Sequence, residues 1–110
     1  MSHTKRITQT GKNNTLVEQA KMCLANASKY CKDNDFQRVE SALTGALNDL
    51  KSIKEHPDSQ AVLDFKTKIR GIDAEVRQNR NSTAQFAERL SKMAEEVLTL
   101  AVAEEVPVGD

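Results

Sequence analysis

The segment SQAVLDFKTKIRGIDAEVRQ, residues 59–78, carries the most regular pattern of apolar residues in the chain. Its apolar side chains recur at alternating steps of three and four residues, which places them on one face of an α-helix. Pro57 ends the preceding segment, because proline disfavours helical geometry at the residue before it. Asp58 or Ser59 can then cap the first turn of the new helix. The expected apolar face consists of Val62, Phe65, Ile69, Ile72 and Val76.

Two helices are expected before this segment. A capping box formed by Thr15 and Glu18 predicts that the first helix covers residues 15–31. After a short polar turn, the second is expected over residues 36–55, where Gly45 marks either a close approach of another backbone or a weakened exposed turn. The apolar positions are Leu16, Ala20, Cys23, Ala27 and Tyr30 in the first helix, and Phe36, Val39, Leu43, Ala46 or Leu47, Leu50 and Ile53 in the second.

A fourth helix is expected after residue 82. Ser82 and Gln85 form a second capping box, and the helix should fray from Glu104 onward. Four segments of similar length with short links favour an all-α, antiparallel up-and-down four-helix bundle. The apolar positions of the fourth segment are Phe86, Leu90, Met93, Val97 and Leu100.

A second architecture also fits the pattern. The apolar face of residues 59–78 continues in register through Asn79 and Thr83 into the fourth segment. A helical hairpin followed by one long coiled-coil helix, which dimerises, is therefore the alternative fold, with a polar layer in its seam.

The length of 110 residues suits one domain with a single modest core. Residues 1–14 contain Lys5, Arg6 and Lys12 and almost no apolar side chains, so they are expected to form a disordered basic tail. Residues 15–104 then form a single helical-bundle domain, and residues 105–110 form a disordered acidic tail.

The charge balance, hydropathy and cysteine spacing of the chain limit the functions that it can have. The 16 basic and 16 acidic residues balance, so no overall charge attracts nucleic acid or an anionic membrane. No apolar run has the length of a membrane-spanning helix, and the first residues lack a secretory signal. Cys23 and Cys31 lie in one predicted helix, about 12 Å apart along its axis, too far for a disulfide. We therefore expect a cytoplasmic protein in a reducing compartment.

Residues for catalysis are scarce. The chain has two histidines, His3 in the expected tail and His56 in a turn, and it lacks Glu-x-x-His and Cys-x-x-Cys motifs. Its four glycines are isolated from one another, so no glycine-rich phosphate loop is present. The sequence predicts a protein that is not an enzyme and that needs no cofactor and no metal.

Part of the chain resembles known helical interaction domains. The run from Ala27 to Tyr30, the following Asp35-Phe36 and the Ala/Leu-rich segment 42–50 are similar to the helical hairpin of tetratricopeptide-like and microtubule-interacting-and-transport domains. The resemblance covers Leu16 to Gln78. It implies a surface that binds helical peptides in grooves between helices, although the fourth helix of this chain departs from that pattern and could occupy such a groove.

These observations favour a non-catalytic protein–protein interaction module, such as an adaptor, a chaperone-like protein or an assembly factor. Its partner would be a protein, for example one that offers a helical peptide to an apolar groove, or a second copy of the chain. Candidate contact residues lie beside the main apolar face of their helices, where singly exposed apolar side chains are also common. They are Met22, Leu63, Leu98 and Val102.

A nucleic-acid-binding helical protein and a structural homo-oligomer are the alternatives. Nucleic acid would require a basic strip that follows helical spacing from residue 66 to residue 80, together with the basic N-terminal tail. Acidic residues interleave with the strip, and no aromatic side chain accompanies it for base stacking, so nucleic acid is the less favoured partner. The strip consists of Lys66, Arg70, Arg77 and Arg80.

Overall fold

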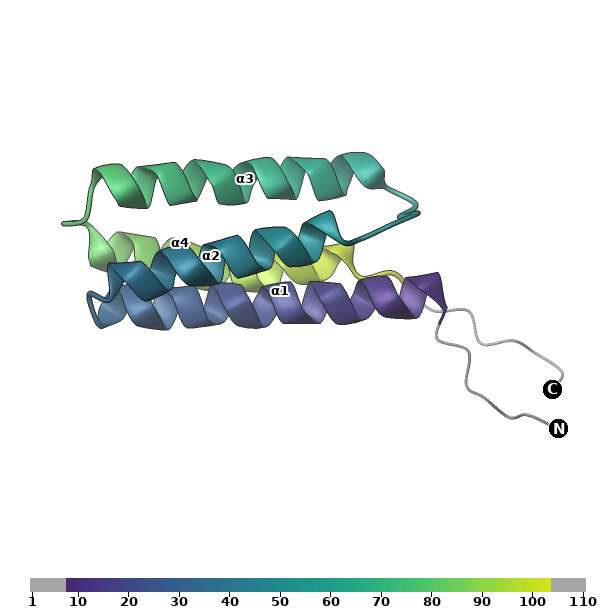
Figure 1. The fold of residues 1–110 in the computed structure, drawn as a ribbon, viewed down its shortest axis with the longest axis horizontal. Coiled ribbons are helices and arrows are strands. Elements are labelled where there is room, and N and C mark those ends of the chain that lie inside the picture. Colours follow the sequence, from purple (N-terminus) through teal and green to yellow (C-terminus); the bar gives the residue numbers. More distant parts are fainter. Residues whose placement is uncertain (1–7, 104–110) are drawn as a thin grey trace, which may run out of the picture.

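The computed structural model describes residues 8–103, which form an antiparallel bundle of four α-helices (Figure 1). Within that range the chain contains no β-strand, and the predicted all-α bundle is confirmed. The third and fourth helices are separate, so the alternative of one long helix is not the arrangement seen. The elements are α1 (Gln9–Lys32), α2 (Phe36–Lys51), α3 (Ser59–Gln78), α4 (Thr83–Glu96) and the 3₁₀ helix η1 (Val97–Leu100).

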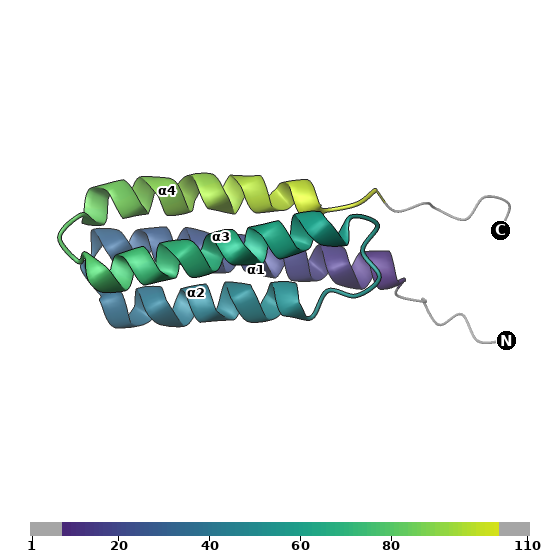
Figure 2. The same cartoon turned by 90° about the horizontal axis from the view of Figure 1, so that it is seen from above.

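Helix α1 packs closely against both α2 and α4, while α3 lies diagonally across the bundle from α1 (Figures 1 and 2). Small residues explain the close packing, because the distance between two helices depends on the side chains at their contact. Ala20 and Ala27 of α1 are fully buried, as is Ala46 of α2. Helix α3 instead presents the larger Phe65 and Ile69, so its backbone stays further from its neighbours.

The core confirms the apolar faces predicted for residues 59–78 and for the fourth segment, since all ten residues are buried. In α1 the buried face is turned by one residue from the prediction. Leu16, Cys23 and Tyr30 are only partly buried, because the helix must face α2 and α4 at once. The fully buried side chains of α1 are Val17, Ala20, Leu24, Ala27 and Cys31.

The N-terminal boundary was predicted wrongly. Helix α1 begins at Gln9, with Thr8 as its N-cap: the Thr8 hydroxyl accepts a hydrogen bond of 2.8 Å from the Gly11 amide. Thr15 therefore lies inside the helix, and its hydroxyl donates to the Gly11 carbonyl instead of capping. Residues 1–7 of the predicted basic tail lie outside the described part of the chain.

Two asparagines explain why α1 extends beyond its predicted start. The amide of Asn13, which is 3 % exposed, donates to the Lys54 carbonyl (2.7 Å) and accepts from the Lys54 amide (3.2 Å). Asn14 makes the same pair of bonds with the backbone of Val102, at 2.7 and 2.9 Å. The two asparagines bond to backbone groups of Lys54 and Val102, which lie in irregular segments and would otherwise lack these hydrogen-bond partners. The same bonds hold the first turns of α1 in place.

His56 joins the same end of the bundle. Its Nδ1 accepts a hydrogen bond from the Asp58 amide at 2.9 Å, and its Nε2 lies 2.7 Å from the Leu100 carbonyl oxygen. Because a carbonyl oxygen only accepts, Nε2 is the donor in this contact. The predicted turn histidine therefore links the start of α3 to the end of η1.

Three other boundaries differ from the sequence pattern. Helix α2 ends at Lys51 instead of near residue 55, and Glu55 adopts a left-handed conformation with φ of 54°. Ser82 occupies the predicted N-cap of α4 without making a side-chain cap bond. After Glu96 the helix tightens into η1 instead of continuing to residue 104. The predicted acidic tail, residues 105–110, lies outside the described residues.

Candidate interaction surfaces

A shallow groove of about 460 Å³ lies along α4 from Ala84 to Lys92, beside Lys32 at the end of α1. We call it the α1–α4 groove. Its walls combine alanine carbon atoms with three charged side chains. Lys92 and Glu88 stand 3.9 Å apart and are both largely exposed, so they form only a loose pair. The lining residues are Lys32, Ala84, Ala87, Glu88, Ser91 and Lys92.

Helix α4 builds this groove through a flank of small residues. Ala84, Ala87 and Ser91 follow one another at steps of three and four, and so share one side of the helix. At the base of the contact, the Ser28 hydroxyl of α1 donates a hydrogen bond of 2.5 Å to the Ala87 carbonyl. This small-residue flank was not predicted from the sequence, because alanine and serine at these steps are also common on an exposed helix surface.

A second shallow groove, of about 340 Å³, lies between α1 and α2. Its lining is more polar, and it includes Arg38, which stacks over the Tyr30 ring at 5.7 Å and pairs with Asp35 at 3.3 Å. The arginine is thus already engaged within the bundle. The lining residues are Cys23, Asn26, Tyr30, Arg38, Ser41 and Ala42.

The thiol in this second groove is a poor nucleophile. Burial raises the pKa of Cys23, and so do the charge of the Asp49 carboxylate and its hydrogen bond with the thiol, at 3.8 Å. Burial also raises the pKa of Asp49, and the Cys23 bond partly offsets that effect. Burial alone raises the pKa of Cys31. Since the thiolate is the reactive form, both cysteines are held in their unreactive state.

The four predicted contact residues occupy different elements. Met22 on α1, Leu63 on α3 and Leu98 on η1 are 62, 46 and 41 % exposed, whereas Val102 is partly buried. Met22 and Leu63 belong to helices that lie on opposite sides of the bundle, α1 and α3 (Figure 1). Neither groove described above is lined by any of the four.

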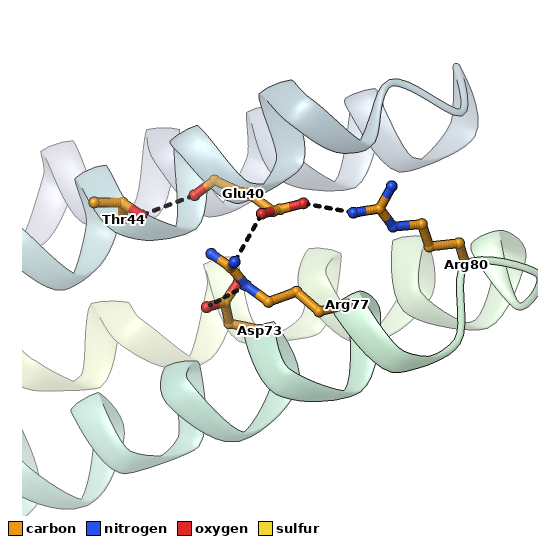
Figure 3. A network of polar contacts seen from close by, with 5 residues as sticks. All are labelled: Glu40, Thr44, Asp73, Arg77 and Arg80. Carbon is orange, nitrogen blue, oxygen red and sulfur yellow. Dashed lines mark hydrogen bonds and ion pairs between the residues drawn. The ribbon is translucent and has the colours of Figure 1, made fainter.

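The basic strip is partly occupied by contacts within the bundle. Arg77 lies 3.0 Å and Arg80 3.1 Å from the Glu40 carboxylate of α2, and Arg77 also pairs with Asp73 (Figure 3). Arg80 additionally stacks over the Phe36 ring at 5.5 Å. The other two cations, Lys66 and Arg70, make no ion pair with a described residue.

Glu40 was not singled out from the sequence, yet it joins α2 to α3. Its side chain is 22 % exposed and receives both arginines, one on each carboxylate oxygen (Figure 3). Glu40 follows the buried Val39 in α2, so it lies beside the face of α2 that packs on the core. No local pattern indicated that its partners would come from the end of α3 and the turn that follows.

Two further ion pairs connect α3 to α4. Arg89 donates to both carboxylate oxygens of Glu75, at 2.9 and 2.8 Å, and Lys68 lies 2.9 Å from Glu96. The hydrogen bonds from Arg89 are the main reason that the pKa of Glu75 lies below its ordinary value. All four side chains are about half exposed, so the pairs orient the two helices more than they stabilise them.

The described residues contain no group of three or more His, Cys, Asp or Glu side chains placed to hold a metal ion. Between residues 8 and 103, no helix has both the length and the hydropathy needed to cross a membrane. Comparisons of the chain with known protein families, characterised proteins and solved structures found no match.

Proposed function

We propose that the protein is a non-catalytic interaction module whose α1–α4 groove receives a helix from a partner protein. The observation that carries this proposal is the composition of the groove. Ala84 and Ser91 are exposed small residues on one flank of α4, and they allow a partner backbone to approach closely, as small residues do between α1 and its own neighbours.

Charge indicates which helix would fit. Lys32 and Lys92 stand on opposite helices that border the groove, while Glu88 is the single acidic residue among those lining it. A partner helix with alanine or other small apolar residues on one face and acidic residues on its flanks would complement both features. Such a partner agrees with the helical peptide expected from the sequence.

The nucleic-acid alternative is less favoured. Arg77 and Arg80 would have to leave Glu40 to reach phosphates, so half of the proposed basic strip is already neutralised. Of the strip, only Lys66 and Arg70 remain beside the cations of the N-terminal segment, and two cations supply little of the counterion release that drives nucleic-acid binding.

A pair of synthetic helical peptides tests the proposal. Both carry the same alanine-rich face, and one has glutamates and the other lysines on the flanks. We expect only the glutamate peptide to shift the amide NMR signals of Lys32 and of residues 84–92. Ala84→Trp should abolish these shifts, because the indole fills the groove at an exposed position.

Gln37→Trp is the matched control, since it places the same side chain at an exposed position of α2 that does not line the groove. It should leave binding unchanged. A response to both peptides, to neither of them, or one that survives Ala84→Trp would contradict the proposal.

A further inference from the structure

We infer that two copies of the chain can exchange their α4 helices, with the turn between α3 and α4 straightening to join the two helices into one. The partner is a second copy of this chain, because α4 then docks on a surface that already fits it. This inference does not depend on the groove-binding function.

The apolar pattern is continuous across the turn. Positions of the buried face of α3 continue at alternating steps of three and four into the buried face of α4, with Asn79 and Thr83 as the two polar positions. Two helices that merely fold back on each other need no such common register. A sustained heptad pattern with a polar residue at one core position is typical of a continuous coiled-coil helix.

The turn itself permits a continuous helix. Residues 79–82 contain neither proline nor glycine, and none of them has a positive φ. The other two turns differ: Asn34 has a φ of 57°, and Pro57 lies before α3. The α3–α4 turn is closed by exposed hydrogen bonds among its own residues, and Ser82 makes no side-chain cap bond to the backbone of α4.

Exchange would preserve the contacts of α4. Its close backbone contact is with α1, including the Ser28–Ala87 hydrogen bond, and its ion pairs with α3 come from long side chains. A second copy offers the same partners in the same geometry, so these interactions form again between chains. The α1–α4 groove would then be built from both copies.

Arg80 favours the closed monomer. It lies within the turn and binds Glu40 and the Phe36 ring of the same chain. A straightened helix carries its backbone away from α2, so these two contacts belong to the closed turn. Removing the Arg80 side chain should therefore shift the population toward exchange.

The experiment measures the dimer fraction by light scattering after the chain is refolded at high concentration and then diluted. We expect a wild-type dimer that persists after dilution, because separation requires α4 to leave α1. Arg80→Ala should raise the dimer fraction several-fold. Arg70→Ala, which removes the same charge at an exposed position of α3 without a described ion pair, should not.

Thr83→Pro should have the opposite effect to Arg80→Ala, because it should prevent exchange. Proline is favoured at the first position of a helix such as α4 but clashes with the carbonyl four residues earlier in a continuous helix, so the variant should be monomeric. In a mixed dimer of isotope-labelled and unlabelled chains, nuclear Overhauser effects between Ser28 and Ala87 should cross from one chain to the other.

A wild-type chain that remains wholly monomeric would overturn the inference. So would a dimer that shows no Ser28–Ala87 effect between chains, since it would use another interface. If Thr83→Pro does not fold, the comparison of Arg80→Ala with Arg70→Ala decides alone, and equal dimer fractions in those two variants would refute exchange.

Discussion

Two glycines in helix interiors should respond differently to alanine. A Cβ atom added at Gly71 of α3 meets no heavy atom within 4 Å, whereas one added at Gly45 of α2 would lie 3.2 Å from the Cys23 sulfur. Alanine is favoured over glycine inside a helix by about 0.8–1 kcal/mol. We expect Gly71→Ala to gain this full amount and Gly45→Ala to gain less.

The difference depends on how Cys23 can move. Its side chain is partly buried and lines the groove between α1 and α2, so the sulfur can turn away at the cost of its 3.8 Å contact with Asp49. We expect Gly45→Ala to gain no more than about 0.5 kcal/mol, roughly half the propensity difference between the two residues. In a Cys23→Ala background the obstacle is gone, and the full gain should return.

Urea unfolding followed by circular dichroism measures these free energies in the four single and combined variants. A gain of about 1 kcal/mol should also raise the melting temperature by about 4–8 °C in a domain of this size. Equal gains at the two glycines would refute the reasoning. So would a Gly45→Ala gain that is the same with and without the Cys23 side chain, because the sulfur contact would then be irrelevant.

Three further outcomes are expected. Asp49→Asn should lower the pKa of Cys23, because the carboxylate raises it by charge and by hydrogen bonding; the rate of alkylation at Cys23, followed by mass spectrometry against pH, should have its midpoint at lower pH in the variant. The pKa of Glu75 is lower in the folded state than its ordinary value of 4.5. The pair with Arg89 therefore stabilises the fold fully at pH values above 4.5. This stability is lost as the pH falls through the lower pKa of the folded state. A double-mutant cycle at neutral pH should give less than about 1 kcal/mol for this half-exposed pair, and no coupling at acidic pH. Glu40→Gln should destabilise the bundle by about 1 kcal/mol in urea unfolding and free its two arginine partners, so retention on immobilised heparin should increase if the basic strip binds polyanions.

Much of the fold follows from local pattern. The apolar faces of α3 and α4 were predicted residue by residue, because a helix that packs on one side repeats its buried positions at fixed steps. Asp58 was one of the two residues expected to cap α3, and its carboxylate accepts from the Ala61 amide at 3.0 Å. For Gly45 the sequence left two interpretations open, a close approach of another backbone or a weakened exposed turn; the structure places the Cys23 sulfur 3.2 Å from the position of an added Cβ atom.

The candidate surfaces were less predictable. Met22, Leu63 and Leu98 were chosen as apolar residues beside a stripe, and they are exposed, but helix packing places them on separate elements. The α1–α4 groove depends on which flanks of two helices meet. In the sequence alone, a flank of alanine and serine cannot be told from ordinary exposed helix surface. The packing of α4 against α1 is needed to identify it as part of a groove.

The sequence by itself determined the all-α class and the buried positions of α3 and α4, since these depend on the spacing of side chains along one segment, whereas the break between α3 and α4 was left open by the continuous pattern. Only the tertiary structure decided where α1 begins and which charges pair. Asn13 and Asn14 extend α1 because they bond to backbone around Lys54 and Val102, and Glu40 meets arginines far along the chain. Such contacts join residues distant in sequence, and their energies come from a geometry that exists only after the helices have packed.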